Sequence, residues 1–234
     1  MSNTSTPDKV FGRRKGKRLS SRQKNNIEFH LSKFSVFKMN DDGSFKIGKI
    51  DLTSLFENLK ENELEIGFGM GDFLFQKALA QPNVGFLGCE VYENGVASLL
   101  TRIIEANLSN VLIHSGNCTD LLDNLSGAEL NAVHLLFPDP WPKSKHHKRR
   151  FFTKENIDKM YCALRRGGCI FIATDIEEYA IQINLCMGER SDFEIKNFVI
   201  KDFKFPLGKN FQTKFERKAY AFNRTPRYMI FKKV

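Results

Sequence analysis

The sequence predicts an α/β fold with a doubly wound, mostly parallel sheet. The prediction follows from the alternation of two kinds of segment along the chain. Short apolar runs, which are typical of buried strands, alternate along the chain with longer stretches whose apolar residues recur at helical spacing. This alternation is typical of parallel sheets that carry helices on both faces. The chain has 234 residues, 41% of them hydrophobic, which is enough for one sizeable core.

The first clear unit is a strand, Glu63–Ile66, that leads into a glycine-rich turn. Three glycines alternate along residues 67–71, where they allow tight curvature and let a ligand approach the backbone closely. A helix is predicted over Phe73–Ala80 and a second strand over Val84–Val91. Glu90 stands near the end of the second strand. An acid at this place hydrogen-bonds ribose hydroxyls in nucleotide-binding α/β folds.

The remaining elements continue the alternation. Helices are predicted over residues 93–107, 154–164 and 177–187, and strands over residues 111–114, 133–137, 169–174, 193–200 and 228–232. In such sheets, ligands bind beyond the carboxyl ends of the strands. Polar side chains stand at or just past several of these ends: Glu65, Glu90, Asn117, Asp139 and Asp175. We therefore expect the functional site at that edge of the sheet.

A proline-rich stretch follows the central predicted strand. Three prolines spaced two apart occupy residues 138–142, and each restricts the residue before it to extended conformations. We therefore expect Phe137, Asp139 and Trp141 to follow a stiff, extended path. The segment Lys143–Arg150 comes next, with five lysines and arginines and no acid. An acidic point beside a dense positive patch indicates chemistry on a polyanion.

Charge and cysteine usage narrow the class of protein. The net charge of +9 favours anionic partners such as nucleic acid or a membrane surface. No apolar run approaches the roughly 18 residues of a membrane span, and no signal peptide is evident. The five cysteines form no Cys-x-x-Cys pair, so neither a disulfide framework nor a metal site is indicated. We expect a reducing cytoplasm, no membrane and no metal.

Residues 1–24 form a separate basic segment, with eight lysines and arginines against one acid. Few apolar residues interrupt it, so we expect a disordered arm when the protein is free. It could bind nucleic acid or act as a solubilising tail. Residues 25–234 are expected to form a single domain, as a monomer or a homodimer.

The predicted pocket suggests its own ligand. The glycine spacing is Gly-x-Gly-x-Gly instead of the dinucleotide pattern, and the expected pocket carries Glu65, Glu90 and Asp139. We expect no lysine or arginine near it to bind a pyrophosphate. An acid-lined pocket suits a ligand with a ribose, an ammonium and a positive sulfonium, which is S-adenosylmethionine.

The motifs of this chain also resemble those of one family, the tRNA (guanine-N7-)-methyltransferases. Their order is the same: Leu64–Gly71, Gly88–Val91, Phe137–Arg150, Ala173–Asp175 and Thr213–Glu216. The third motif is similar to the bacterial branch. The resemblance implies a Rossmann-like class I S-adenosylmethionine-dependent methyltransferase fold with seven strands. It also implies methylation of guanosine 46 in the variable loop of tRNA.

The resemblance further implies roles for single residues. The cofactor would be held by Glu65, Gly67, Gly69, Glu90, Asn117 and Asp139, and the substrate by Lys143, Asp175, Thr213, Lys214, Phe215 and Glu216. Asp139 would also be the catalytic residue. Asn117 stands where the family usually has Asp, so it keeps a hydrogen-bond acceptor for the adenine amine but loses the charge.

Elementary chemistry supports these roles. Guanine N7 carries an in-plane lone pair, so methylation there needs alignment and electrostatics and no proton removal. The carboxylate of Glu216 could accept both N1–H and the exocyclic amine of guanine. We expect the cations Lys145, Lys148, Arg149 and Arg150 to contact phosphates, which position RNA without reading its sequence.

Two other functions stay open on the sequence alone. Methyltransferases that act on exocyclic amines of nucleic-acid bases also carry an Asp-Pro loop after the fourth strand. A non-catalytic RNA-binding module could have kept the same fold, although Glu65, Glu90 and Asp139 argue against it.

Overall fold

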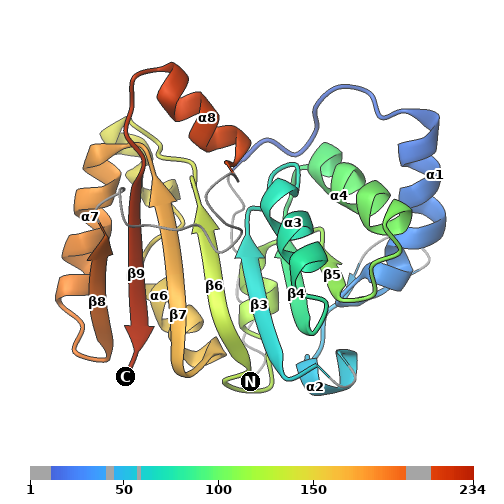
Figure 1. Ribbon diagram of the computed structural model, residues 1–234, viewed down its shortest axis with the longest axis horizontal. Helices are drawn as coiled ribbons and strands as arrows, with labels where there is room; N and C mark the ends of the chain where they lie inside the picture. The colour runs from blue at the N-terminus through green and yellow to red at the C-terminus, as the bar shows by residue number, and fades with distance from the viewer. Residues whose placement is uncertain (1–11, 41–44, 57–58, 199–211) are drawn as a thin grey trace, which may run out of the picture.

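A computed structural model describes residues 12–40, 45–56, 59–198 and 212–234 (Figure 1). Its main element is a seven-stranded sheet with the strand order β5-β4-β3-β6-β7-β9-β8. In chain order the strands are β3 Glu61–Ile66, β4 Val84–Cys89, β5 Val111–His114, β6 Leu130–Leu136, β7 Leu164–Thr174, β8 Phe193–Phe198 and β9 Arg227–Lys233. Strands β3 to β7 run parallel, and β9 lies antiparallel between β7 and β8. The predicted doubly wound, mostly parallel sheet is confirmed.

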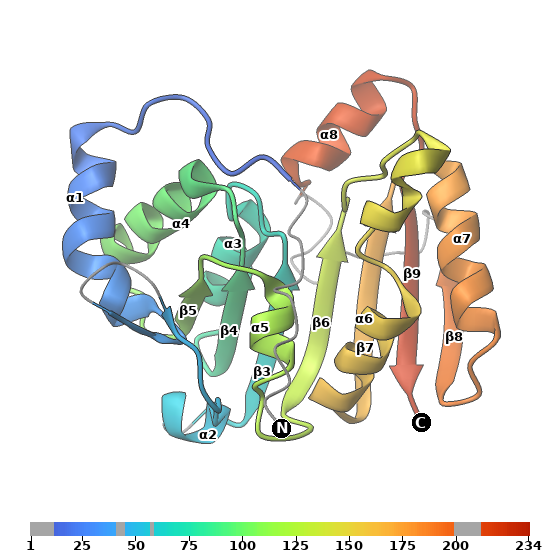
Figure 2. The same ribbon diagram turned by 180° about the vertical axis from the view of Figure 1, so that it is seen from behind.

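Helices cover both faces of this sheet (Figures 1 and 2). One face carries α3 Asp72–Ala80 and α4 Glu93–Glu105, and the other carries α5 Cys118–Leu122, α6 Lys154–Ala163 and α7 Glu177–Gly188. Successive side chains of each strand point to opposite faces of the sheet, because the strand is pleated. On β4, Phe86 packs into the core beneath α3 and α4, whereas Leu87 and Cys89 pack into the core on the other face. The sheet is therefore buried on both sides.

Among the predicted strands, the largest difference in a boundary is at the start of β7. The sequence predicted a helix to residue 164 and a strand from Cys169, but α6 ends at Ala163 and β7 begins at Leu164. The pairing of β6 with β7 is irregular at its start, and Gly167 has a φ of 78°. Two positions along β6, from Leu130 to Ala132, face five along β7, from Leu164 to Cys169, so the segment that looked like a turn is an irregularity inside β7.

Several short elements were not predicted. They are α1 Ser21–His30, α2 Leu52–Leu55, α5, α8 Lys214–Ala221, the two-residue strands β1 Lys38–Met39 and β2 Phe45–Lys46, and the 3-10 helices η1 Leu31–Phe34 and η2 Ser144–Arg149. Helix α1 has no buried residue and therefore no apolar stripe. Its signal was the capping box of Ser20 and Gln23, in which each side chain accepts from the other's backbone N–H.

Helix α1 overlaps the basic N-terminal segment that we expected to be disordered. Residues 12–20 have a described path, and the expected boundary at residue 24 falls inside α1. The helix is attached to α4, where Asn26 donates to the Thr101 hydroxyl over 3.0 Å and Arg22 forms an ion pair with Glu105. Residues 1–11 lie outside the described part of the chain.

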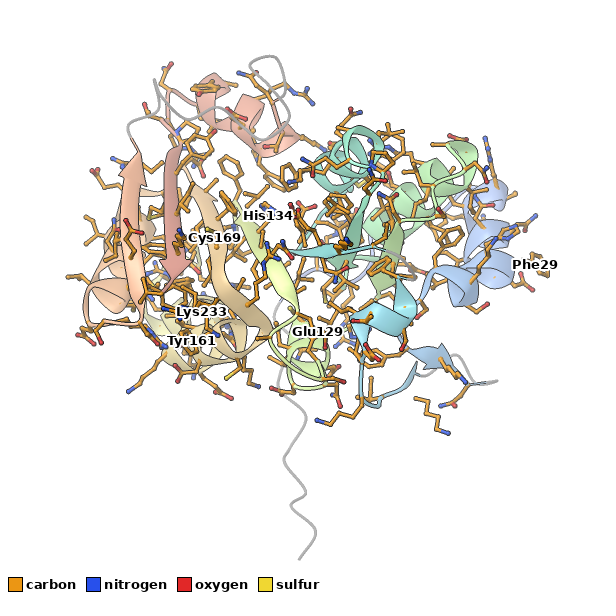
Figure 3. The ribbon with its side chains drawn as sticks, turned by 60° about the horizontal axis from the view of Figure 1, so that its bottom comes forward. Phe29, Glu129, His134, Tyr161, Cys169 and Lys233 are labelled. Carbon is orange, nitrogen blue, oxygen red and sulfur yellow. The ribbon has the colours of Figure 1, made fainter. Side chains whose placement is uncertain are left out.

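A buried cluster of charged and polar side chains joins β3, β6 and α3 beneath the functional edge. The Glu63 carboxylate lies 2.7 Å from the Lys77 ammonium and 2.7 Å from His134 Nε2. His134 lies near the middle of the sheet (Figure 3). Burial alone would raise the pKa of Glu63, but hydrogen bonds and charge from His134 and Lys77 lower it to about 2. The carboxylate is therefore a fixed anion at neutral pH.

This cluster predicts that Lys77→Met destabilises the protein by about 3–5 kcal/mol, because it leaves the Glu63 charge buried without its cation. The double variant Glu63→Gln/Lys77→Met should recover most of that loss, since a neutral amide can still bond His134. Urea unfolding measures both. Lys49→Met, at an exposed lysine, is the control, expected within about 0.5 kcal/mol of wild type. Equal stability of Lys77→Met and wild type would contradict the analysis.

Candidate active site

The glycine-rich turn forms the centre of the site. Gly67, Gly69 and Gly71 have φ values of 71°, 56° and 78°, in the left-handed region that only glycine occupies without strain. The chain therefore reverses direction between β3 and α3 in a tight loop. This tight turn at the carboxyl edge of the sheet agrees with the curvature predicted from the glycine spacing.

Glu90 fixes this turn to the neighbouring loop. One carboxylate oxygen accepts from Gly69 N–H over 2.7 Å, and the other accepts from the N–H groups of Val91 and Tyr92 over 2.7 and 2.9 Å. Burial raises the pKa of Glu90, although these three bonds act in the opposite direction. The oxygen that accepts from Gly69 makes one of these bonds only, so its second lone pair can still accept from a ligand hydroxyl.

Gly95 is a further residue of this arrangement, and the sequence analysis missed it. It lies in the first turn of α4, and a Cβ built there would stand 2.0 Å from the carbonyl oxygen of Gly69. Helix α4 can approach the glycine turn only because this side chain is absent. Nothing in the pattern around Gly95 distinguishes it from an ordinary helical glycine.

A cavity of about 650 Å³, here called the main cavity, opens beside the glycine turn. Four predicted cofactor residues, Gly67, Gly69, Glu90 and Asn117, line it together with Asp139. Asn117 also caps α5, where its side-chain oxygen accepts from Thr119 N–H over 3.3 Å. The strand ends thus bring together residues that are up to 72 positions apart in the chain.

A second, smaller cavity of about 190 Å³, here called the side cavity, lies between the glycine turn and α8. Glu65 lines it and is 3% exposed. Burial raises the pKa of Glu65 to about 8, and the nearby acids Glu90 and Asp72 add to this effect. Its Oε2 atom has no hydrogen-bond partner among the described residues. A buried acceptor without a partner indicates a place for a ligand's donor group.

The proline-rich loop departs from the extended path that we expected. Phe137 and Trp141 have φ values of 53° and 44°, so both stand in the left-handed region despite the prolines that follow them. The prediction of extended residues is wrong at these two positions, because the chain turns at each end of the loop. Such strain commonly occurs at functional sites. Both residues and Asp139 between them line the main cavity.

The side chains around Trp141 are cationic or aromatic. The Arg149 guanidinium lies 5.0 Å from the centre of the Trp141 ring, and His146 meets the ring edge-on at 6.0 Å. Asp139 is exposed at the cavity rim, yet the surrounding protein removes enough water to raise the pKa of its carboxyl. The loop thus presents one carboxyl group next to a cation-stacked indole.

Arg150 does not have the role that we predicted for it. It is 3% exposed, so it is not available to an RNA phosphate in this structure. Its Nε donates to the Pro140 carbonyl over 2.7 Å, and its other nitrogens bond Gln182 and Glu178 of α7. Arg150 therefore holds the Asp139 loop on α7. Its neighbours Lys143, Lys145 and Lys148 are exposed as expected.

The predicted substrate residues fall into two groups. Thr213, Lys214 and Phe215, at the start of α8, line the side cavity, and Phe215 also lines the main cavity. Lys143, Asp175 and Glu216 belong to the lining of neither cavity. Asp175 forms an ion pair with Arg224 at 2.9 Å, and Glu216 is buried on the underside of α8 against Tyr228. Burial raises the pKa of Glu216.

The N-terminal segment contributes residues that the sequence analysis did not place in the site. Residues 12–13 line the main cavity. The segment is fixed where Glu93 N–H donates to the Arg14 carbonyl over 2.9 Å and Gly16 N–H donates to Asn94 over 2.8 Å. Figure 1 shows it passing between α8 and α1 above the sheet.

Cations also line the outer part of the main cavity, contrary to our expectation. They are Arg13, Lys148, Arg149 and Arg150. They come from the N-terminal segment and from the basic run that ends at Arg150, both far from the glycine turn in the sequence, which is why the pattern around that turn did not indicate them. Within the described ranges, no three His, Cys, Asp or Glu side chains are arranged to hold a metal. Every helix that the structure describes is too short or too polar to cross a membrane.

Comparisons with known proteins agree with this geometry. A family model described as putative methyltransferase matches residues 60–227. The tRNA (guanine-N(7)-)-methyltransferase of Roseobacter denitrificans is 38% identical to this chain, over 99% of both. The chain belongs to this family. The tRNA (guanine-N(7)-)-methyltransferase of Rhizobium johnstonii is also 38% identical, over 96% of this chain and 94% of its own length.

Solved structures resemble the fold. The 16S rRNA methyltransferase KamB has a TM-score of 0.58 at 12% identity, covering 84% of this chain and 94% of its own. An antibiotic-related methyltransferase has a TM-score of 0.53 at 15% identity, covering 87% and 98%. Together with the observed sheet, they confirm the predicted Rossmann-like class I methyltransferase fold.

The close approach of Gly95 to Gly69 predicts that alanine at position 95 destabilises the protein, which is the opposite of the usual effect of this substitution in a helix. Glycine to alanine inside a helix normally stabilises it by up to about 1 kcal/mol. Gly95→Ala should instead cost about 1–3 kcal/mol, as overpacking does, and should weaken cofactor binding because the glycine turn moves. Thermal unfolding and calorimetric titration with S-adenosylmethionine measure the two effects. Gly188→Ala, at a helical glycine with open space around it, is the control. A stabilised Gly95→Ala with unchanged affinity would contradict the analysis.

Proposed function

We propose that this protein transfers a methyl group from S-adenosylmethionine to N7 of a guanosine in tRNA, at position 46 of the variable loop. The observation that carries the proposal is the position of Asp139, at the rim where an acid-lined cavity meets a cationic surface. The family membership supports the same reaction. In this proposal the tRNA is the partner and the compartment is the cytoplasm.

The residues present fit the cofactor. Glu65 offers a buried carboxyl oxygen without a partner to the amino group, and Glu90 stands at the strand end where ribose hydroxyls bind. Asn117, beyond β5, supplies an acceptor for the adenine amine. When bound, S-adenosylmethionine supplies an electrophilic methyl group on a positive sulfur. Gly67 and Gly69 leave room for the ligand next to the backbone.

Asp139 performs the electrostatic part of the reaction. The N7 lone pair needs no base, so the task of the protein is to align the guanine and to stabilise positive charge as it moves onto the purine. The Asp139 carboxylate, held by the loop that Arg150 anchors, lies where it can do both. Phe215 and Trp141 flank the cavity and can stack on the base.

The cations around the cavity hold the RNA. Lys143, Lys145 and Lys148 are exposed on the loop and on η2, and Arg13 approaches from the N-terminal segment. They bind phosphates and set the register of the tRNA. In this proposal residues 25–234 form one domain, and the basic segment before them adds sequence-independent attraction. The protein acts as a monomer or a homodimer.

Methyl transfer from labelled cofactor to unmodified tRNA transcripts, followed by nucleoside identification, tests the function. We expect 7-methylguanosine in wild type. Asp139→Asn should lower kcat by about a hundredfold or more, while thermal unfolding stays the same. Glu28→Gln, an exposed acid on α1, is the isosteric control. A product methylated on an exocyclic amine would contradict the proposal, and so would full activity of Asp139→Asn.

Glu65 predicts the pH dependence of cofactor binding. With its pKa raised to about 8, the carboxyl is mostly protonated at pH 7, and a cationic ligand should displace that proton. Affinity should therefore rise between about pH 6 and 8, by at most roughly tenfold per pH unit. Without ligand the sign is opposite: the stabilising contribution of neutral Glu65 is complete below its unfolded pKa of 4.5 and is lost as pH rises through 8.

Calorimetric titration in two buffers of different ionisation heat measures the released proton. Glu65→Gln, which cannot ionise, should abolish the release and flatten the pH profile, whereas Glu28→Gln should leave both as in wild type. Proton release that persists in Glu65→Gln would show that another group is responsible.

A further inference from the structure

The end of α8 carries an aromatic residue that the fold does not use. Helix α8 lies across the carboxyl edge of the sheet (Figure 1), with Glu216 and Ala219 on its buried side. Phe215 at its start is 47% exposed, and Phe222, the residue that caps its end, is 64% exposed. These two phenylalanines are seven residues apart, so they stand on the same side of the helix.

The conformation of Phe222 is well determined by its surroundings. Asn223 has a φ of 53°, and the N–H groups of Asn223 and Arg224 donate to the carbonyls of Tyr220 and Ala219 over 3.0 and 2.9 Å. This is a Schellman motif, which fixes where the chain leaves the helix. The ring of Phe222 is thus presented on a fixed turn.

A guanidinium also holds the ring. The Arg224 side chain lies 5.4 Å from the centre of the Phe222 ring, and its Nε lies 2.9 Å from a carboxylate oxygen of Asp175. Asp175 follows the last residue of β7, and its side chain is 15% exposed. Asp175 therefore links the ring to the sheet through Arg224.

The charges on the helix indicate the kind of partner. Lys214, Arg217 and Lys218 are exposed, whereas Glu216, the acid of the helix, is buried. An exposed aromatic ring among cations is the combination with which proteins bind unpaired nucleotides, because the ring stacks on a base and the cations bind its phosphates. A peptide or membrane surface would be served by an apolar patch, and Phe222 has charged neighbours instead.

We propose that Phe222 is a stacking platform for an unpaired base of the tRNA, outside the cavity that holds the guanine. Arg224 supports the platform, and Asp175 is a positioning residue that acts through Arg224 without touching the RNA. The proposal rests on the proposed function, since it assigns a second contact to the same substrate.

The test compares Phe222→Ala, Phe222→Trp and Phe29→Ala. Phe29 is the matched control, because it is 66% exposed on α1 and projects from the far side of the molecule (Figure 3). Phe222→Ala should raise both KM and Kd for tRNA by about five- to a hundredfold, the range of one lost base stack. Thermal unfolding and kcat should change little, and Phe222→Trp should restore binding.

Salt dependence separates stacking from charge. Because Phe222 carries no charge, its removal should leave the slope of log Kd against log salt unchanged, whereas Lys218→Ala should reduce the slope by about one phosphate contact. Asp175→Asn should weaken binding in wild type and add nothing in Phe222→Ala, as expected for residues that act as one unit. A fully base-paired RNA duplex of two separate strands, which has no unpaired loop, should bind wild type and Phe222→Ala equally.

Three results would overturn the proposal: tRNA binding by Phe222→Ala within twofold of wild type, failure of Phe222→Trp to restore binding, or an equal loss with the two-stranded RNA duplex. Binding is measured without turnover, so it is independent of the reaction. If wild type made no 7-methylguanosine while Phe222→Ala still lost tRNA binding, the proposed function would fail and the platform would stand.

Discussion

The site depends on the hydrogen bonds of one carboxylate. Glu90 accepts from the N–H groups of Gly69, Val91 and Tyr92, and so joins the glycine turn after β3 to the loop after β4. Without these bonds three partly buried donors would need other partners, and the two loops could move apart. Because Gly95 allows α4 to press on the same turn, the position of the cavity wall is set by hydrogen bonding from one side and by packing from the other. The other residues predicted to bind the cofactor are placed relative to this wall.

Acidic and basic side chains occupy different parts of the site, here called the inner and the outer layer. The inner layer is acidic: Glu65 and Glu90 lie there, and burial raises their pKa values, so a ligand's cation or donor group would stabilise their ionised forms. Asp139 stands at the rim, where burial raises its pKa as well. The outer layer is cationic and comes from η2 and the N-terminal segment. A positively charged cofactor is suited to the inner layer and a polyanion to the outer one. The protein can therefore hold two ligands of opposite charge a short distance apart.

The sequence predicted the parts of the fold that have a periodic apolar pattern. Helix α4 and the strands around it were predicted correctly because burial on one or both sides leaves a regular trace. Helix α1 left none, since it buries no residue. Helix α8 is amphipathic, but the residues it buries are an acid and an alanine, Glu216 and Ala219, so its buried side did not look apolar in the sequence. The site residues at strand ends were predicted for a topological reason. Arg150 was assigned wrongly because a basic run does not reveal which of its members is buried, and the contact partners of Arg150 lie on α7.

The course of the N-terminal segment has a practical consequence for handling the protein. Residues 12–13 form part of the cavity lining, so a tag or fusion partner joined before Met1 is separated from the cavity only by residues 1–11. The last described strand, β9, runs antiparallel to its neighbour β7, so Val234 lies at the end of the sheet opposite the cavities (Figure 1). Affinity handles, fluorophores and surface attachments are therefore better placed after Val234, where they leave the approach of a large RNA unobstructed.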